Sequence, residues 1–214
     1  MDLKVPYLDC INSDSSLREV SAELDQLEHH AIGQRPWPEY PYKPKVFFSI
    51  AYTEDSILLK YFVQEDSIRI SCNIDNSPVH EDSCVEFFIS FDGTEAYYNL
   101  EFNCIGTCLA AFGKSRCERE LLPVGRIADI RRMSVIETVT DGGAARIRWQ
   151  LTLVIPSEIF VHHNITSLKD RNCKVNFYKC GDALPEPHFL SWKEISAADP
   201  DFHLPESFGR MQFV

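Results

Sequence analysis

The sequence predicts an all-β protein, a two-sheet β-sandwich of the jelly-roll kind with a short N-terminal helix. Short segments rich in aromatic and β-branched residues recur from residue 45 to the end of the chain, which is typical of strands. Turn signals separate two pairs of these segments, at Asp92-Gly93 and at Asp141-Gly142-Gly143, and such turns are typical of β-hairpins. The length of 214 residues fits one domain of this class.

The N-terminal helix is predicted over residues 15–30. Ser15 or Ser16 can cap it, and Glu19 can complete a capping box. Apolar residues then recur at helical spacing, at Leu17, Val20, Leu24 and Leu27.

The segment from residue 33 to residue 44 is rich in proline and aromatic residues. Proline disfavours both helices and strand pairing, so this segment is predicted to run extended over the surface or across one end of a sheet. With the helix it forms an N-terminal extension, residues 1–44, which packs on a sandwich formed by residues 45–214.

The sandwich is predicted from strand-like segments and the loops between them. The predicted strands are 45–52, 56–64, 68–73, 84–91, 97–104, 107–112, 133–139, 145–155, 173–180, 189–192 and 210–214. Residues 113–132 are weakly patterned and are predicted as loop, and Pro156 is placed to begin a short helix.

Several strands alternate apolar and polar residues, so each has one face for the core and one polar face. If these strands share a sheet, its second face carries a polar row: Glu86, Asn99, Glu101, Asn176, Tyr178 and Arg148. Carboxylate, amide and guanidinium groups can bind the neighbouring hydroxyls of a sugar. An ordinary solvated sheet face explains the same pattern, and the alternation does not decide between the two.

Composition excludes some classes of partner. The formal net charge is −11, and the Lys and Arg residues are scattered, so no nucleic-acid partner is expected. No apolar run approaches the ~18 residues that span a bilayer, so no membrane partner is expected either. The first residues show no secretory leader, which predicts a cytoplasmic protein, or a periplasmic or secreted one whose leader was removed. The eight cysteines show no metal-binding spacing and are expected to be reduced.

An ordered set of motifs resembles carbohydrate-binding module family 9. The set consists of Glu81-Asp82-Ser83-Cys84-Val85-Glu86-Phe87-Phe88-Ile89, Tyr97-Tyr98-Asn99-Leu100-Glu101-Phe102-Asn103, Val175-Asn176-Phe177, Leu190-Ser191-Trp192 and the segment 202–209. The resemblance covers residues 40–214. It implies a DOMON-like sandwich that binds glucose- or xylose-based oligosaccharides or polysaccharides such as xylan and cellulose without cleaving them, in polysaccharide catabolism.

The resemblance also implies the binding residues. The family's sugar-binding Glu corresponds to Glu86, its Arg and Asn to Asn99 and Glu101, and the two Trp rings that hold the sugar to Phe202 and His80. Trp37 and Tyr40 are further candidates for a stacking ring. Structural calcium is common in the family. Acidic loops that can supply its ligands are Glu54-Asp55, Asp75-Asn76, Glu81-Asp82 and Asp199–Asp201.

Other functions fit the same residues. Glu86 and Glu101 are a candidate carboxylate pair for glycoside hydrolysis, although no common catalytic motif is present. Some DOMON-like domains bind haem, which requires a His or Met ligand in a pocket. His188 and His203 lie near the closing loops, where a pocket role and a surface or capping role are both open. The aromatic segment 36–48 and the C-terminal Phe213-Val214 could instead contact a protein partner.

Overall fold

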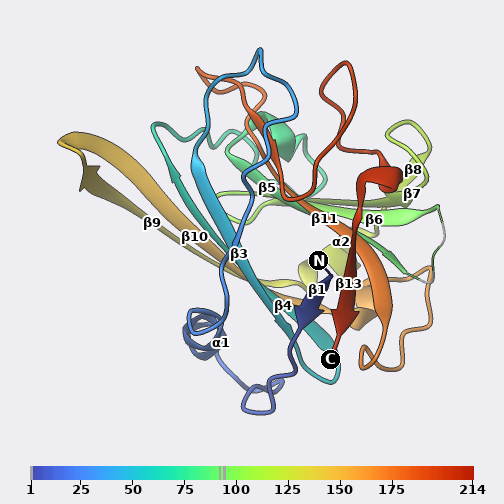
Figure 1. Cartoon of the computed structure of the whole chain (residues 1–214). Helices are drawn as coiled ribbons and strands as arrows, with labels where there is room; N and C mark the ends of the chain where they lie inside the picture. Colours follow the sequence, from blue (N-terminus) through green and yellow to red (C-terminus); the bar gives the residue numbers. More distant parts are fainter. Residues whose placement is uncertain (1, 92, 94) are drawn as a thin grey trace.

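The protein is a sandwich of two β-sheets packed face to face, as Figure 1 shows. The computed structural model describes residues 2–91, 93 and 95–214. Within this part of the chain, the first sheet has eight strands in the order β1-β13-β11-β5-β6-β7-β8, with β12 paired to β11. The second has five strands in the order β2-β3-β4-β10-β9. The predicted all-β sandwich is therefore confirmed.

The strands of the first sheet are β1 (Leu3–Val5), β5 (Cys84–Phe91), β6 (Tyr97–Asn103), β7 (Cys108–Gly113), β8 (Arg119–Leu121), β11 (Asn172–Cys180), β12 (Phe189–Ser191) and β13 (Gly209–Phe213). Those of the second are β2 (His30–Ala31), β3 (Lys45–Tyr52), β4 (Ser56–Glu65), β9 (Arg131–Asp141) and β10 (Ala144–Pro156). All neighbouring strands are antiparallel except β1 and β13. The first 44 residues contribute a strand to each sheet, and the domain boundary at residue 44 stays a prediction.

The helices are short. They are α1 (Leu17–Leu24), α2 (Val124–Ala128) and the 3-10 turns η1 (Val79–Glu81), η2 (Ser157–Ile159) and η3 (Pro205–Ser207). The predicted capping box at the start of α1 is present, with Ser16 and Glu19 bonded to each other's backbone N–H groups. The helix ends six residues earlier than predicted, because His30 and Ala31 pair with β3. None of the described helices is long and apolar enough to span a bilayer.

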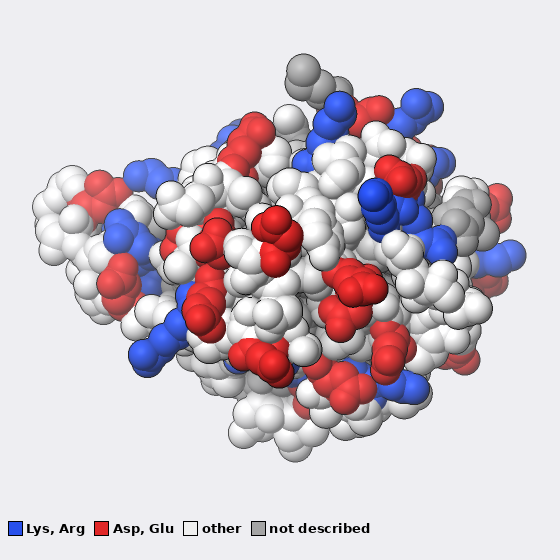
Figure 2. Space-filling view, turned by 90° about the horizontal axis from the view of Figure 1, so that it is seen from below, with Lys and Arg blue, Asp and Glu red and all other residues white. Residues whose placement is uncertain are grey.

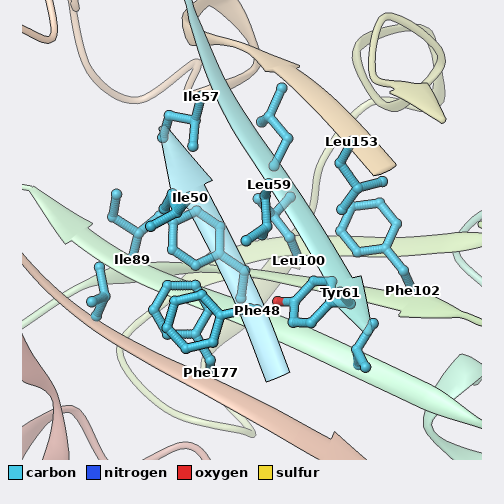
Figure 3. Close-up of a cluster of buried hydrophobic side chains, with 14 of the residues drawn as sticks. Phe48, Ile50, Ile57, Leu59, Tyr61, Ile89, Leu100, Phe102, Leu153 and Phe177 are labelled. Atoms are coloured by element: carbon cyan, nitrogen blue, oxygen red, sulfur yellow. The ribbon is translucent and has the colours of Figure 1, made fainter. Parts of the chain in front are cut away.

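The main core lies between the two sheets, and Figure 3 shows its centre. The rings of Phe48 on β3 and Phe177 on β11 stack at 3.7 Å between centroids, so they join the two sheets directly. Tyr61 of β4 also reaches across and donates a hydrogen bond to the carbonyl oxygen of Glu86 on β5.

Two predicted segments are wrong. Residues 68–73 form no strand: the buried carboxylate of Asp82 accepts hydrogen bonds from the backbone N–H groups of Ser71 and Cys72, in place of a neighbouring strand. The segment 113–132, predicted as loop, contains β8 and α2. β8 is only three residues long, and so short an edge strand leaves little periodicity to detect.

The two predicted hairpins join β5 to β6 and β9 to β10. Gly142 and Gly143 both have positive φ angles, +59° and +83°, as a tight two-residue turn requires. Asp92 lies outside the described residues. The β9–β10 hairpin projects beyond the rest of the sandwich (Figure 1).

The second face of the eight-stranded sheet is covered rather than solvated. A second apolar cluster lies on this face and includes Phe88, Tyr97, Tyr178, Trp37 and Phe202. The irregular chain after β12 supplies part of this cover. A polar site on this face is therefore reached only where the cover is open.

Candidate functional site

One opening in this cover is a small polar pocket above β5, β6 and β11. Its cavity volume is about 60 Å³. Its walls come from the strands, from the loops after β7 and β11, and from the chain before η3. The lining residues are His80, Glu86, Glu101, Arg116, Arg119, Cys180, Asp182, Phe189, Pro200, Asp201, Phe202 and His203.

The two predicted carboxylates form the floor of this pocket. Glu86 on β5 is directly opposite Glu101 on β6, and side chains of such pairs lie about 4.5–5.5 Å apart at Cβ. Both residues are buried, with exposed fractions of 3% and 2%. Strand alternation therefore places Glu86 and Glu101 on one face of the sheet, as predicted. The surrounding loops, which the alternation does not describe, make this part of the face a pocket.

Glu101 accepts hydrogen bonds on only one of its two carboxylate oxygens, among the described residues. Its Oε1 accepts hydrogen bonds from Asn99 Nδ2 at 2.8 Å and from Arg119 Nη1 at 3.1 Å. Its Oε2 is buried and accepts no hydrogen bond from any described residue; His80 Nδ1 lies 3.7 Å away, too far for one. One acceptor at the pocket floor is thus available to a ligand.

The surroundings shift the pKa values of the two carboxyl groups in opposite directions. Burial, and then the nearby Glu101, raise the pKa of Glu86 well above its usual value. Burial also opposes ionisation of Glu101, but His80 and Arg119 outweigh it and keep the pKa of Glu101 below its usual value. These opposite shifts favour a protonated Glu86 beside an ionised Glu101.

Two histidines complete the polar wall with opposite charge states. Glu101 raises the pKa of His80, which favours its protonated form. Burial, with the adjacent Arg119, lowers the pKa of His203 to about 4. His203 Nδ1 lies 2.9 Å from the Tyr97 hydroxyl and its Nε2 3.3 Å from Arg119 Nη1. Because Arg only donates, Nε2 is the acceptor and Nδ1 carries the proton.

Phe202 is the predicted aromatic residue that lines the pocket. Its ring stacks on that of Tyr178, with centroids 4.2 Å apart and planes 9° apart. Tyr178 occupies one face of this ring, and only 8% of Phe202 is exposed. A ligand in the pocket can therefore contact only this small exposed part.

The other predicted residues lie away from the pocket wall. Asn176 binds the backbone of Lys193, and the hydroxyl of Tyr178 donates to the carbonyl oxygen of Phe202. Trp37 is buried and donates to the carbonyl oxygen of Ala197. Tyr40 packs edge-on against Phe189. These four side chains pack in the cover of the sheet and do not line the pocket.

Arg148 does not belong to the polar row. It lies on β10 in the other sheet and forms an ion pair with Glu137. The guanidinium groups at the pocket instead come from Arg116 and Arg119, which sequence reasoning missed because they fall in the segment predicted as loop. Asp182 and Asp201 were missed as pocket residues for the same reason, since irregular loops carry them.

Three of the four acidic loops contain a carboxylate whose protein partner competes with a calcium ion. Asp75 pairs with Arg132, and Asp82 with Arg69, at 2.8 Å each. Asp55 accepts from the hydroxyl of Ser56. Calcium wants six to eight oxygen ligands, so these carboxylates do not fit it in this arrangement, and calcium binding stays a prediction. The haem candidate His188 is fully buried against Lys179.

Comparison with known proteins identifies the family. The profile of carbohydrate-binding family 9 matches residues 18–213. This chain belongs to carbohydrate-binding family 9. The predicted resemblance is therefore confirmed, and the match begins within the segment that was predicted to be an extension. No curated protein matches this chain significantly.

Solved structures agree with this assignment. A candidate carbohydrate-binding protein from Bacteroides uniformis ATCC 8492 is 38% identical, with a TM-score of 0.90, over 100% of this chain and 99% of that one. A family 9 module from Caldicellulosiruptor kristjanssonii shares the fold. It was solved with cellotriose (9% identity, TM-score 0.54, 100% and 93% coverage) and with glucose (9% identity, TM-score 0.53, 100% and 96% coverage).

Proposed function

We propose that this chain binds the end or edge of a glucose- or xylose-based oligosaccharide in the pocket over Glu86 and Glu101, without cleaving it. The observation that carries the proposal is the buried Oε2 of Glu101, which has no hydrogen-bond donor among the described residues. A buried acceptor without a donor costs about 1–3 kcal/mol. A sugar hydroxyl is a donor of the right size to complete it.

The remaining groups match the other requirements of a sugar. Arg119 and protonated Glu86 donate, Glu101 and Asp201 accept, and Phe202 gives an apolar edge. A cavity of about 60 Å³ admits part of a sugar ring rather than a long stretch of polymer. Family membership and the sugar complexes of the Caldicellulosiruptor module support carbohydrate as the ligand class.

Glycoside hydrolysis is the second candidate, because the two carboxyl groups have their pKa values displaced in opposite directions. Such a split is the usual mark of an acid and its partner base. Binding is favoured over hydrolysis because both carboxyl groups lie side by side on one floor, whereas a hydrolase needs them to flank the scissile bond.

Titration calorimetry with cellobiose, xylobiose and their longer oligomers tests the proposal. Glu101→Gln removes the ionised acceptor and should weaken binding by about 10- to 100-fold, since a hydrogen bond to a charged group contributes about 1.5–3 kcal/mol. Glu86→Gln mimics a protonated carboxyl group and should weaken it less. Glu137→Gln, on the exposed β9 strand, is the matched control and should bind normally.

Two outcomes would contradict the proposal. If the folded wild-type chain binds none of these sugars, the pocket serves another ligand. If reducing ends accumulate on incubation and Glu86→Gln stops this, the chain is a hydrolase that uses Glu86 as its acid.

A further inference from the structure

Two buried thiols and a carboxyl group meet at the closed end of the pocket. Cys84 on β5 is directly opposite Cys180 on β11, and Glu86, two residues after Cys84, points to the same side of the sheet. The ligand atoms of the three residues all lie within 4.8 Å of one another. The thiol of Cys180 donates to Glu86 Oε1 at 3.1 Å, so these two groups are already in contact.

We infer that Cys84, Cys180 and Glu86 bind one thiophilic divalent metal ion, with Zn²⁺ as the natural example. Two sulfur ligands and one carboxylate suit Zn²⁺ better than a hard ion such as Ca²⁺ or Mg²⁺. Ligand atoms around a tetrahedral Zn²⁺ lie about 3.5 Å apart, so a small inward movement of the side chains suffices.

The pocket gives such an ion access and an open coordination position. Cys180 and Glu86 line the cavity, while Cys84 lies beneath them and is fully buried. Three protein ligands leave the fourth tetrahedral position facing the cavity, where water or a small ligand can bind. The inference goes beyond sugar binding and does not require it. A metal ion would compete with a sugar for Glu86.

Metal binding at this site must release protons. Cys84 and Cys180 are free cysteines, and an ordinary cysteine is mostly a thiol at neutral pH. Each thiol loses its proton to solvent when its sulfur binds the ion. Affinity should therefore rise with pH, and binding heats should depend on the ionisation enthalpy of the buffer.

The test uses Cd²⁺ as a spectroscopic substitute for Zn²⁺ on the full chain, in phosphine reductant and without sugar. Cys10 and Cys117 are exposed, so both are first changed to Ser to remove competing thiols. One equivalent of Cd²⁺ should produce the ultraviolet charge-transfer band of cadmium thiolate, and Zn²⁺ should abolish it. Cys84→Ser and Cys180→Ser should each lose most of the band. Cys104→Ser, which removes another buried thiol, should keep it.

A second measurement does not depend on these variants folding. X-ray absorption of the chain loaded with one equivalent of Zn²⁺ should show two sulfur ligands, and calorimetry in two buffers should show at least two protons released per ion. Absence of the band at one equivalent, a band unchanged in both Cys84→Ser and Cys180→Ser, or a Zn²⁺ shell of oxygen and nitrogen alone would each overturn the inference. Because no sugar is present, none of these results depends on carbohydrate binding.

Discussion

Lys179 and Glu65 form a charged pair inside the sandwich, directly behind the pocket floor. Lys179 is on β11 next to Cys180, and its Nζ lies 3.1 Å from Glu65 Oε2 on β4. Both residues are at most 1% exposed. The same Glu65 accepts a hydrogen bond from Trp149 Nε1 at 2.6 Å, and Lys179 donates to His188 Nε2 at 2.8 Å.

Lys179→Met leaves the Glu65 carboxylate buried without its cation. At 3.1 Å, the Coulomb attraction in a medium of effective dielectric constant ~20 is about 5 kcal/mol. Solvation lost by both charges offsets part of it, and breaking a buried pair at one partner typically costs about 3–5 kcal/mol. We expect Lys179→Met to lower the free energy of unfolding by an amount in that range.

Urea unfolding followed by tryptophan fluorescence and circular dichroism measures the effect. The double variant Glu65→Gln with Lys179→Met removes both charges and retains an acceptor for Trp149, so it should recover most of the lost free energy. Lys45→Met with Asp141→Asn, which removes an exposed ion pair, should change stability by less than about 1 kcal/mol. A loss below about 1 kcal/mol in Lys179→Met, or no recovery in the double variant, would refute this reasoning.

Two further predictions concern a half-buried histidine and a buried carboxylate. His203 has a folded-state pKa of about 4 against an ordinary value of 6.5, so the unfolded chain binds the extra proton between these values. The contribution of neutral His203 to stability is therefore complete above pH ~6.5 and is lost as the pH falls toward 4, at up to about 1.4 kcal/mol per pH unit. Urea unfolding at a series of pH values should show that the free energy of unfolding falls less steeply with decreasing pH in His203→Gln. Asp82 accepts hydrogen bonds from Arg69 and from two backbone N–H groups, so Asp82→Asn should cost at least about 2 kcal/mol of unfolding free energy, and an unchanged urea midpoint would contradict this.

Strand alternation predicted the sheets and the pocket floor because both depend on local periodicity. Val85 and Phe87 face the core while Glu86 faces the opposite side, as a period of two requires. The residues that form hydrogen bonds with the carboxylates of the pocket floor could not be predicted in the same way. Arg119 reaches Glu101 from the three-residue strand β8, and no periodic signal marks so short a strand.

The alternation pattern also could not predict whether the polar face of the sheet is exposed to solvent. A polar residue on a strand faces away from the main core, but a second layer can still cover it. Asn176 and Tyr178 alternate as solvated residues do, yet both are fully buried because residues after β12 lie over them. Lys179 is the opposite exception, because it is a charged residue that faces the core. Glu65 from the other sheet pairs with its charge.

The net charge of the chain likewise does not predict which charged groups line the pocket. Figure 2 shows Asp and Glu side chains grouped over the middle of one face, with Lys and Arg mostly toward its margins, as the net charge of −11 leads one to expect. Four carboxyl groups line the pocket, and Arg116 and Arg119 stand beside them. The net charge of the chain does not specify this local arrangement.

The rim of the pocket depends on a hydrogen bond between distant parts of the chain. Trp37 Nε1 donates to the carbonyl oxygen of Ala197 at 3.1 Å, which ties the irregular segment carrying Phe202 to the N-terminal region. Trp37→Phe removes this bond at a cost of about 1 kcal/mol and should loosen the rim. We expect faster amide hydrogen exchange across residues 195–204 and several-fold weaker sugar binding.

Tyr52→Phe is the matched control for this rim. It removes a hydrogen bond of similar strength, from the Tyr52 hydroxyl to the carbonyl oxygen of Val214, and neither residue lines the pocket. It should lower global stability to a similar extent and leave both exchange at 195–204 and sugar affinity unchanged. If Trp37→Phe and Tyr52→Phe speed up exchange at 195–204 equally, the protection of this segment reflects global stability and not the Trp37 hydrogen bond. Faster exchange in Trp37→Phe alone would show that a residue with no contact to the ligand sets the shape of the pocket.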